Sequence, residues 1–438
     1  DSSTSRGLGD VYKRQTFPPS LTLCPVLNFH GPHFFTSGSL NKKDNTMKSH
    51  PLFEKLRIFA PGPTPVPDLV LAEMARSPLH HRTKEFVEIL TRVKTGLQFL
   101  FQTKQPAYVL SSSGTGAMET VIVNLFAQGD EVIVVDGGKF GERWGKLAGK
   151  FGLTVHTLKV DWGTAVSPDE VVQQLKAHPK TRGVLFQASE TSTGVYHPVK
   201  EIAEAVHKNS DALVIVDAIT ALGVVDLPME KWGLDAVVSG SQKALMLPPG
   251  LAFLALSERA HEQRKRSNIP NFYFNLGAED KAALGGETAW TPAVSLICGL
   301  DVVLTQLQKT GLEPVFKHHA RLAEATRRGV KGLGLELFAK TSPSDAVTAV
   351  HVPKEISEGK KVVSYLRDQF GVTIAGGQDA WKGKIFRIAH LGFYDELDML
   401  TILSAIENTL KALGGHIELG QGVAAASQYF LESRNHGK

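Results

Sequence analysis

The sequence predicts an α/β protein whose large domain has a mostly parallel, seven-stranded sheet and whose smaller C-terminal domain is α+β. Two observations support this class. Between residues 105 and 256, short β-branched runs alternate with amphipathic helical segments, the pattern of βαβ units in a parallel sheet. Beyond about residue 310 that alternation stops, and long helical segments with few strands follow.

The predicted elements follow in chain order. Seven apolar or β-branched runs are the strand candidates of the large sheet: Ala107–Leu110, Glu131–Val135, Thr154–Leu158, Gly183–Gln187, Leu213–Asp217, Ala236–Ser239 and Leu251–Leu256. The helices expected between and after them are Ala117–Phe126, Pro168–Ala177, Val199–Lys208 and Ala293–Lys309. The second region has expected strands at Val347–Val352 and Lys384–Ala389 and a long final helix around Asp395–Leu413. Parallel sheets place their working residues at the carboxyl ends of the strands.

Residues 1–46 differ from the rest of the chain. Ser, Thr, Pro, Gly and Asn are scattered there without helical or strand periodicity, so we expect a disordered tail that precedes a natural start at Met47. A transit peptide is the alternative, but Asp1, Asp10 and Asp44 depart from its acid-poor pattern. The expected organisation is an N-terminal segment at 47–75, a large domain at 76–309 and a small domain at 310–430.

Composition excludes several classes of protein. Hydrophobic residues make up 42% and charged residues 21%, which is typical of a folded globular chain. A net charge of +4 leaves no electrostatic footprint for nucleic acid, and no apolar run is long enough to cross a bilayer. Two cysteines are too few for a disulfide framework. Without a signal peptide, the cytoplasm is the expected location.

Three segments carry chemistry. Ser111–Gly116 follows a predicted strand and opens a helix, where free N–H groups and the helix dipole favour a phosphate. Asp217 ends an apolar strand, and Lys243 follows another one, 26 residues later. Taken singly, a simple turn, a helix cap and a surface lysine explain them as well. Together they match pyridoxal 5'-phosphate, which needs an anion site, a carboxylate for its ring nitrogen and a lysine for its aldehyde.

With these motifs in order, the chain resembles the class V aminotransferases of pyridoxal-phosphate fold type I, most closely the alanine–glyoxylate and serine–pyruvate group. The resemblance covers nearly all of residues 58–415. It rests on Pro61–Pro65, Ser113–Thr115, Glu190–Gly194, Asp217, Ser239–Lys243 and Lys384–Ile388.

The resemblance implies a role for each matching residue. Lys243 would hold the cofactor covalently and move the proton between Cα and C4′, while Asp217 would pair with the pyridine nitrogen and Thr191 would reach the ring hydroxyl. Arg387 would bind the substrate α-carboxylate; a structural salt bridge is the alternative. The phosphate would be held by Ser113, Gly114, Thr115 and Gln242, with Thr288 and Thr291 reaching over from the partner subunit of a homodimer.

Two positions depart from the animal members of the family. Phe140 stands where those carry a Trp stacked on the cofactor ring, and a phenylalanine can still stack. Thr288 stands where they carry a Tyr for the partner's phosphate, so that contact and a plain loop hydroxyl are both open. His80 and His81 are adjacent, which does not suit a shared metal ion, and Cys298 is expected to pack in a helix.

The expected activity is transamination by a ping-pong mechanism, from a small amino acid such as alanine or serine to glyoxylate or pyruvate. A transaminase of aminoethylphosphonate or ureidoglycine is the alternative, because the motifs fix the cofactor and the carboxylate but not the side-chain pocket. A cysteine desulfurase needs a nucleophilic cysteine on a mobile loop, which Cys24 and Cys298 do not provide. A non-catalytic subunit of the same fold is the remaining hypothesis.

Overall fold

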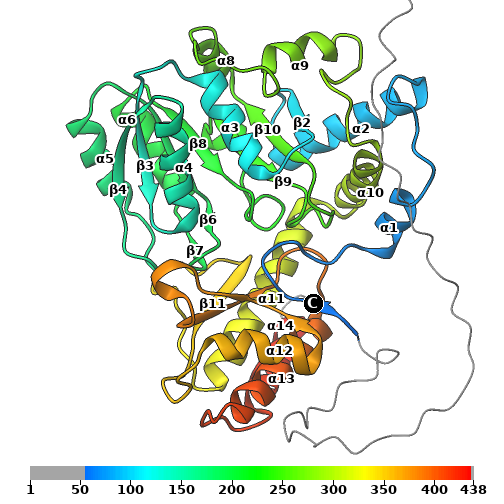
Figure 1. The fold of residues 1–438 in the computed structure, drawn as a ribbon, viewed down its shortest axis with the longest axis vertical. Coiled ribbons are helices and arrows are strands. Elements are labelled where there is room, and N and C mark those ends of the chain that lie inside the picture. The colour runs from blue at the N-terminus through cyan, green and yellow to red at the C-terminus, as the bar shows by residue number, and fades with distance from the viewer. Residues whose placement is uncertain (1–54, 436–438) are drawn as a thin grey trace, which may run out of the picture. The chain divides into compact units, whose positions relative to one another are not determined.

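A computed structural model describes residues 55–435 of the chain. The predicted tail at 1–46 and the expected start at Met47 lie outside these residues. Within them, a broad twisted sheet carries helices on both faces, and a smaller sheet with its own helices lies at the lower end of the view in Figure 1. This confirms the α/β class and the smaller α+β region that the sequence predicts.

All seven predicted strands form the large sheet. In spatial order they are β2 (Ala107–Leu110), β10 (Ala252–Leu256), β9 (Ala236–Gly240), β8 (Leu213–Asp217), β5 (Thr181–Gln187), β3 (Glu131–Asp136) and β4 (Thr154–Lys159). The strands β9, β8, β5, β3 and β4 are parallel, and β10 is antiparallel to both of its neighbours. The parallel strands thus define a carboxyl edge, where Gln187, Asp217 and Gly240 end their strands, and an amino edge, where Glu131 and Thr181 begin theirs.

Strand β8 shows why the strands of this sheet have apolar residues at consecutive positions rather than at alternate ones. Val214 and Val216 belong to the core on one face of the sheet, whereas Leu213 and Ile215 belong to the core on the other. Both faces are buried, so neither set of alternating residues needs to be polar. The first face is covered by α2 (Lys84–Phe101), α5 (Pro168–Ala177), α6 (Val199–Asn209) and α10 (Val294–Thr310), and the second by α3 (Gly114–Leu125), α4 (Lys139–Lys150) and α8 (Glu258–Arg264).

The prediction that helix α3 opens at Ala117 was wrong by three residues. The helix begins at Gly114. Its first turn was not predicted because Gly-Thr-Gly has low intrinsic helix propensity. A Cβ atom on Gly114 would lie 2.4 Å from Ile219 Cδ1, and one on Gly116 would lie 1.9 Å from Ser112 Oγ. A larger residue at either position would force the Ile219 or Ser112 side chain to move. The helix N-terminus coincides with the Ser-Gly-Thr motif.

The smaller region is richer in helix than predicted. Strands β11 (Val347–His351) and β14 (Ile385–Ala389) match the prediction, and β13 (Ala375–Gly376) completes an antiparallel sheet. The helix expected to be the last, α13 (Glu396–Ala412), is followed by α14 (Gln421–Asn435), so that prediction was wrong. Small residues weaken the apolar pattern of α14, and its packing on α11 determines its fold. The helices here are α11 (Leu312–Gly332), α12 (Lys360–Phe370), α13 and α14.

The N-terminal segment contacts both regions. Strand β1 (Arg57–Ile58) pairs in parallel with β12 (Val372–Thr373), and Phe59 lies in the core of the smaller region. Helix α1 (Asp68–Met74) then packs on α10 of the large region. The boundaries predicted at 75/76 and 309/310 stay predictions. The remaining elements are β6 (Ser189–Glu190), β7 (Val195–Tyr196), α7 (Met229–Trp232), α9 (Leu276–Ala283) and a short 3-10 helix (Asp379–Trp381).

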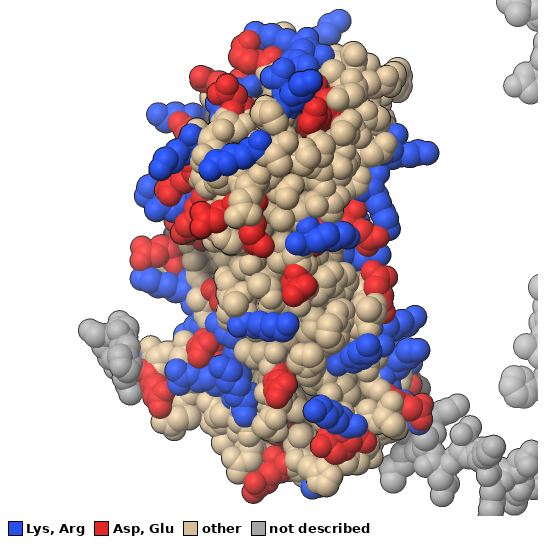
Figure 2. Space-filling model, turned by 90° about the vertical axis from the view of Figure 1, so that its left-hand side faces the viewer, with Lys and Arg blue, Asp and Glu red and all other residues tan. Residues whose placement is uncertain are grey.

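The surface carries no broad area of a single charge on the face drawn in Figure 2, where acidic and basic side chains alternate. This agrees with the small net charge of the chain. Among the described helices, none is both long and apolar enough to cross a membrane.

Candidate active site

The sheet brings two of the predicted residues to the same edge. Asp217 ends β8 and lies opposite Gln187, the last residue of β5. Lys243 follows the end of β9, the strand next to β8. Parallel strands end at one edge, so a separation of 26 residues in the chain becomes proximity in space.

Lys243 is buried, with 8% of its surface exposed. Its Nζ donates to the carbonyl oxygen of Pro61, and its own carbonyl accepts a hydrogen bond of 2.9 Å from Thr64 Oγ1. Gly62 has φ of +121°, and a Cβ atom there would lie 2.6 Å from Lys243 Nζ. The Pro61–Pro65 loop therefore closes over the lysine, and a glycine is required at its closest point.

Burial lowers the pKa of the Lys243 amine to about 8, and the attraction of Asp217 only partly opposes this. Positive charge on Arg387 and Arg143 lowers that pKa further. The pKa of the Asp217 carboxyl is raised to about 7 by burial, although it accepts a hydrogen bond of 2.9 Å from Ile219 N. A lysine with a lowered pKa supplies more neutral amine near neutral pH, which nucleophilic attack on an aldehyde requires.

The N-terminus of α3 is open toward an anion. Ser113 is the N-cap, but its side chain makes no capping hydrogen bond. In the described part of the chain, the N–H groups of Gly114 and Thr115 donate no hydrogen bond. Gly240, which ends β9, lies so close that a Cβ atom there would be 3.5 Å from Gly114 N and 3.1 Å from Gln242 Oε1. The predicted phosphate residues thus converge, although they are far apart in sequence.

Two buried amides at this edge lack partners. Gln242 Oε1 and both polar atoms of the Gln187 side chain are buried without a hydrogen-bond partner among the described residues. Leaving such groups unpaired costs free energy, on the order of 1–3 kcal/mol each. Gln187 was not predicted as a site residue; its only sequence signal is an amide at the end of an apolar strand. These atoms suit a site that is completed by a polar group from outside the chain.

Arg387 on β14 reaches from the smaller region to the same place. Its side chain is buried, and its Nη1 donates a 3.0 Å hydrogen bond to the carbonyl oxygen of Thr191. Its Nε and Nη2 donate to the carbonyl oxygen of Gly376, at 3.1 and 2.8 Å. It forms no salt bridge with any carboxylate of residues 55–435, so the structural salt bridge considered above is not observed. Burial lowers its pKa to about 10.

Thr191 and Phe140 lie beside these groups. Thr191, in the turn between β6 and β7, shares a 2.7 Å hydrogen bond with Thr220 through their hydroxyls. Phe140, in the first turn of α4, is half-buried, and the guanidinium carbon of Arg143 lies 4.8 Å from its ring centroid. The Nη1 atom of Arg143 also donates to Thr115 Oγ1 at 3.1 Å. Sequence reasoning missed Arg143, although its spacing of three from Phe140 on one helix face is a usable signal.

A third missed residue is Glu190, which fixes the N-terminus of α4. Its fully buried carboxylate accepts hydrogen bonds from Phe140 N and Gly141 N, each at 3.1 Å. It also accepts from Ser192 N at 3.0 Å and from Ser192 Oγ at 2.6 Å. Burial raises the pKa of Glu190, and these hydrogen bonds lower it. The carboxylate therefore holds the helix that carries Phe140 and Arg143.

The two threonines expected to serve a partner subunit lie on the segment before α10. Thr288 Oγ1 donates to the carbonyl oxygen of Trp290 at 2.7 Å, and Thr291 is exposed. Nearby, Ala293 N donates to Ser111 Oγ at 3.2 Å. The role of Thr288 and Thr291 toward a second copy of the chain stays a prediction.

Comparison with known proteins identifies the family. The sequence model described as "Aminotransferase class-V" matches residues 60–390. The chain belongs to the class V aminotransferases. This aminotransferase has pyridoxal 5'-phosphate as its cofactor, and its substrates are an amino donor and a 2-oxo acid. The free N–H groups of Gly114 and Thr115 and the unpaired amide of Gln242 fit the anionic and polar groups of that cofactor.

Similar proteins carry several names. The chain is 43% identical over 379 residues to a protein of Synechococcus sp. named "Soluble hydrogenase, small subunit", with 86% of this chain and 98% of the relative covered. It is 36% identical to a serine–glyoxylate aminotransferase of Hyphomicrobium methylovorum (86% and 95% covered) and 33% identical to an L-aspartate–glyoxylate aminotransferase of Paracoccus denitrificans (86% and 96%). Among solved structures, ureidoglycine–glyoxylate aminotransferase of Bacillus subtilis superposes with a TM-score of 0.81 at 31% identity, covering 87% of this chain and all of the other.

Proposed function

We propose that this aminotransferase transfers the amino group of a small amino acid to glyoxylate, in two half-reactions of a ping-pong mechanism. One observation carries the proposal: a buried lysine, a buried carboxylate and a buried guanidinium without a carboxylate partner converge at the carboxyl edge. The names of three similar aminotransferases also share glyoxylate as a substrate. Alanine and serine are the donors that we put first.

Each residue has a task in this proposal. Pyridoxal phosphate, when bound, supplies an electron sink for the charge that develops at the substrate Cα. Asp217 carries the negative charge that favours a protonated ring nitrogen beside it. Lys243 anchors the cofactor and, once released, carries the proton to and from Cα. Thr191 stays the candidate for the ring hydroxyl, and Phe140 the candidate for stacking on the ring.

Arg387 selects substrates that have a carboxylate. Its guanidinium donates three hydrogen bonds to two carbonyl oxygens. These bonds hold the side chain in place, but carbonyl oxygens do not neutralise its positive charge. A substrate carboxylate would supply the missing negative charge, and the planar fork can bind it through parallel hydrogen bonds. Both substrates of a transamination, the amino acid and the 2-oxo acid, carry this group.

We also propose that the active site is completed in a homodimer. Ser113, Gly114, Thr115 and Gln242 hold the phosphate from one chain, and Thr288 and Thr291 of the second chain approach it from outside. Thr291 is exposed and Thr288 is partly exposed, so a second chain can reach both. Mass measurement in solution, with a Thr291→Ala variant assayed for cofactor retention, tests the sharing.

The name of the Synechococcus relative raises the question of a hydrogenase subunit. Iron–sulfur clusters are commonly held by four cysteine thiolates. The chain has two cysteines in all, and Cys298 is buried in α10. The residues present therefore support transamination and not a metal cluster of this kind.

A substrate screen of the holoenzyme tests the proposal. The visible absorbance of the bound cofactor is recorded after addition of alanine, serine or aspartate without an acceptor, and then after glyoxylate is added. Loss of the band with a donor and its return with glyoxylate would support the proposal. A band that no amino acid changes would contradict it. Ureidoglycine belongs in the same screen, since the structural similarity to a ureidoglycine–glyoxylate aminotransferase favours it as a second candidate donor.

A further inference from the structure

Three metal-ligating side chains meet toward the amino edge of the sheet, away from the proposed cofactor site. Glu131 begins β3, and His156 is the third residue of β4, the strand at the end of the sheet. His178 is the C-cap of α5. One potential ligand atom from each residue lies within 4.8 Å of the other two. Parallel pairing of β3 with β4 and the return of α5 bring them together from three separate segments.

His156 already contacts both of the other side chains. Glu131 Oε2 and His156 Nε2 lie 2.9 Å apart in a hydrogen bond. The rings of His156 and His178 stack with centroids 3.5 Å apart and an interplanar angle of 13°. Within residues 55–435, the ring nitrogens of His178 have no hydrogen-bond partner. One imidazole is therefore oriented by a carboxylate, and a second has nitrogens available.

We propose that Glu131, His156 and His178 bind a divalent transition metal ion such as Zn²⁺. Two imidazoles and one carboxylate are a ligand set that zinc accepts, with water in the fourth position. In tetrahedral coordination the ligand atoms lie roughly 3.4 Å apart, so a small spreading of Glu131 from His156 and a turn of the His178 ring complete the site. The metal takes the place of the proton that Glu131 and His156 share, and no redox step is involved.

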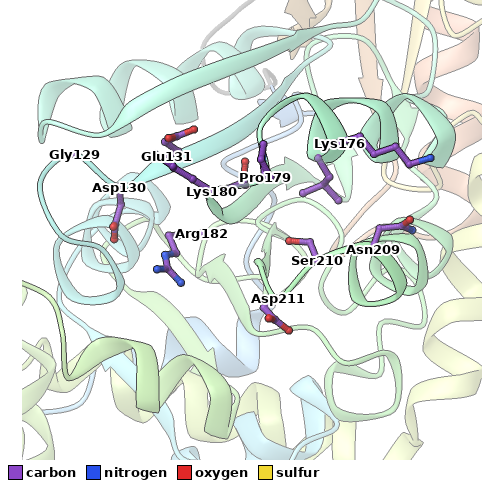
Figure 3. Close-up of a pocket in the computed structure, with 12 residues that line it drawn as sticks. Gly129, Asp130, Glu131, Lys176, Pro179, Lys180, Arg182, Asn209, Ser210 and Asp211 are labelled. Atoms are coloured by element: carbon purple, nitrogen blue, oxygen red, sulfur yellow. The ribbon is translucent and has the colours of Figure 1, made fainter.

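The surroundings permit entry of an ion. Glu131 and His156 retain 26% and 20% of their side-chain surface, so the ion stays in contact with water. A hollow of about 730 Å³ opens beside Glu131, and Lys180 and Arg182 line it. Figure 3 shows that the Glu131 and Arg182 side chains point away from each other. The positive charges of Lys180 and Arg182 weaken binding without occupying the ligand positions.

This site would act on stability, not on transamination. The ion would join β4, which has a neighbour on one side only, to β3 and to the end of α5. An ion that binds only the folded chain stabilises it in proportion to the logarithm of its concentration over the dissociation constant. The proposed cofactor site lies at the carboxyl edge, so metal binding and turnover are measured independently.

The test uses tag-free holoenzyme and Co²⁺ as a spectroscopic probe. Wild-type protein is expected to show saturable visible ligand-field bands, at longer wavelength than the cofactor, and Zn²⁺ is expected to displace them and to raise the melting temperature. His178→Ala and Glu131→Gln are expected to weaken binding at least about tenfold and to abolish the Zn²⁺-dependent rise. Two variants are used because Glu131→Gln preserves side-chain volume where an alanine could disturb folding.

The matched control is His81→Ala. His80 and His81 form another stacked pair, with centroids 4.7 Å apart, but no carboxylate completes a cluster with them in the described part of the chain. This variant is expected to bind Co²⁺ as the wild type does. Absence of saturable binding in the wild type overturns the proposal, and so does equal affinity in wild type and in both cluster variants, since the ion would then bind elsewhere.

Discussion

The two edges of the large sheet hold ionisable groups in different ways. At the carboxyl edge, Lys243, Asp217 and Glu190 are buried, and burial is the largest cause of their shifted pKa values. Toward the amino edge, Glu131 and His156 are only partly buried and pair with each other. Charge buried in a fold costs free energy unless it is paired or used. The difference indicates that the carboxyl edge is built around chemistry, whereas the amino edge presents a surface site.

The largest effect is expected from Lys243→Ala, which tests whether the buried lysine of the carboxyl edge is the reactive one. We expect turnover to fall at least about 10⁴-fold, since the variant lacks both the anchor and the proton carrier. The measurements are steady-state turnover and the visible band of the bound cofactor. Lys265→Ala, which removes an exposed lysine from an ion pair with Glu262, is the control and should retain both. A Lys243→Ala protein with normal band and turnover would show that the buried lysine is not the reactive one.

Arg387→Lys tests whether the buried guanidinium is a carboxylate receptor. Lysine keeps the charge but not the planar fork, so kcat/KM for the amino donor should fall by roughly 30- to 1000-fold, or about 2–4 kcal/mol. Cofactor content should stay unchanged, because among residues 55–435 the Arg387 side chain donates its hydrogen bonds to the carbonyl oxygens of Thr191 and Gly376. Arg266→Lys, on a partly exposed ion pair with Asp130, is the control. Loss of cofactor with unchanged KM would assign Arg387 a purely structural role.

Three residues of the carboxyl edge show what the sequence alone could predict. Lys243, Asp217 and Arg387 each follow or sit in a short apolar strand, and the strands themselves were predictable because both faces of the sheet are buried. Arg143 and Glu190 were missed, because their roles depend on contacts across 28 and about 50 residues of sequence. Local spacing places Arg143 on the helix face of Phe140, but it does not encode the contacts of Arg143 with Thr115 or of Glu190 with α4.

The helices show the same limit. Helix α13 has a clear apolar stripe and was predicted, whereas α14 is rich in Ala, Gly, Ser and Gln and was not. It folds because α11 offers glycines for close packing: a Cβ atom on Gly332 would lie 2.9 Å from Ala425 Cβ. Tertiary contact, and not periodicity, decides such elements.

Glu190→Gln tests whether Glu190 stabilises the fold around the site by holding the N-terminus of α4. A glutamine places its NH₂ group opposite one of two pairs of donors, either the N–H groups of Phe140 and Gly141 or the N–H and O–H groups of Ser192. Two donors then lose their acceptor, at about 1–3 kcal/mol each. We expect the free energy of unfolding to fall by about 2–6 kcal/mol in urea denaturation. Glu262→Gln, at an exposed ion pair, should change it by no more than about 0.5 kcal/mol. Equal stability of the two variants would show that Glu190 does not hold α4.

The smallest expected effect concerns the pKa of Lys243. The amine attacks the cofactor aldehyde only when neutral, so capture of the cofactor by apoprotein should accelerate about tenfold per pH unit up to about pH 8 and then level off.

Arg143 lowers this pKa through its positive charge. Arg143→Gln should therefore raise it and slow capture at pH 7 by less than about tenfold, with the same limiting rate reached at a higher pH. Arg182→Gln, an equivalent loss of charge beside the hollow at the amino edge, is the control. Stopped-flow absorbance between pH 6 and 9 measures both, and equal profiles would show that the two edges are not electrostatically distinct at Lys243.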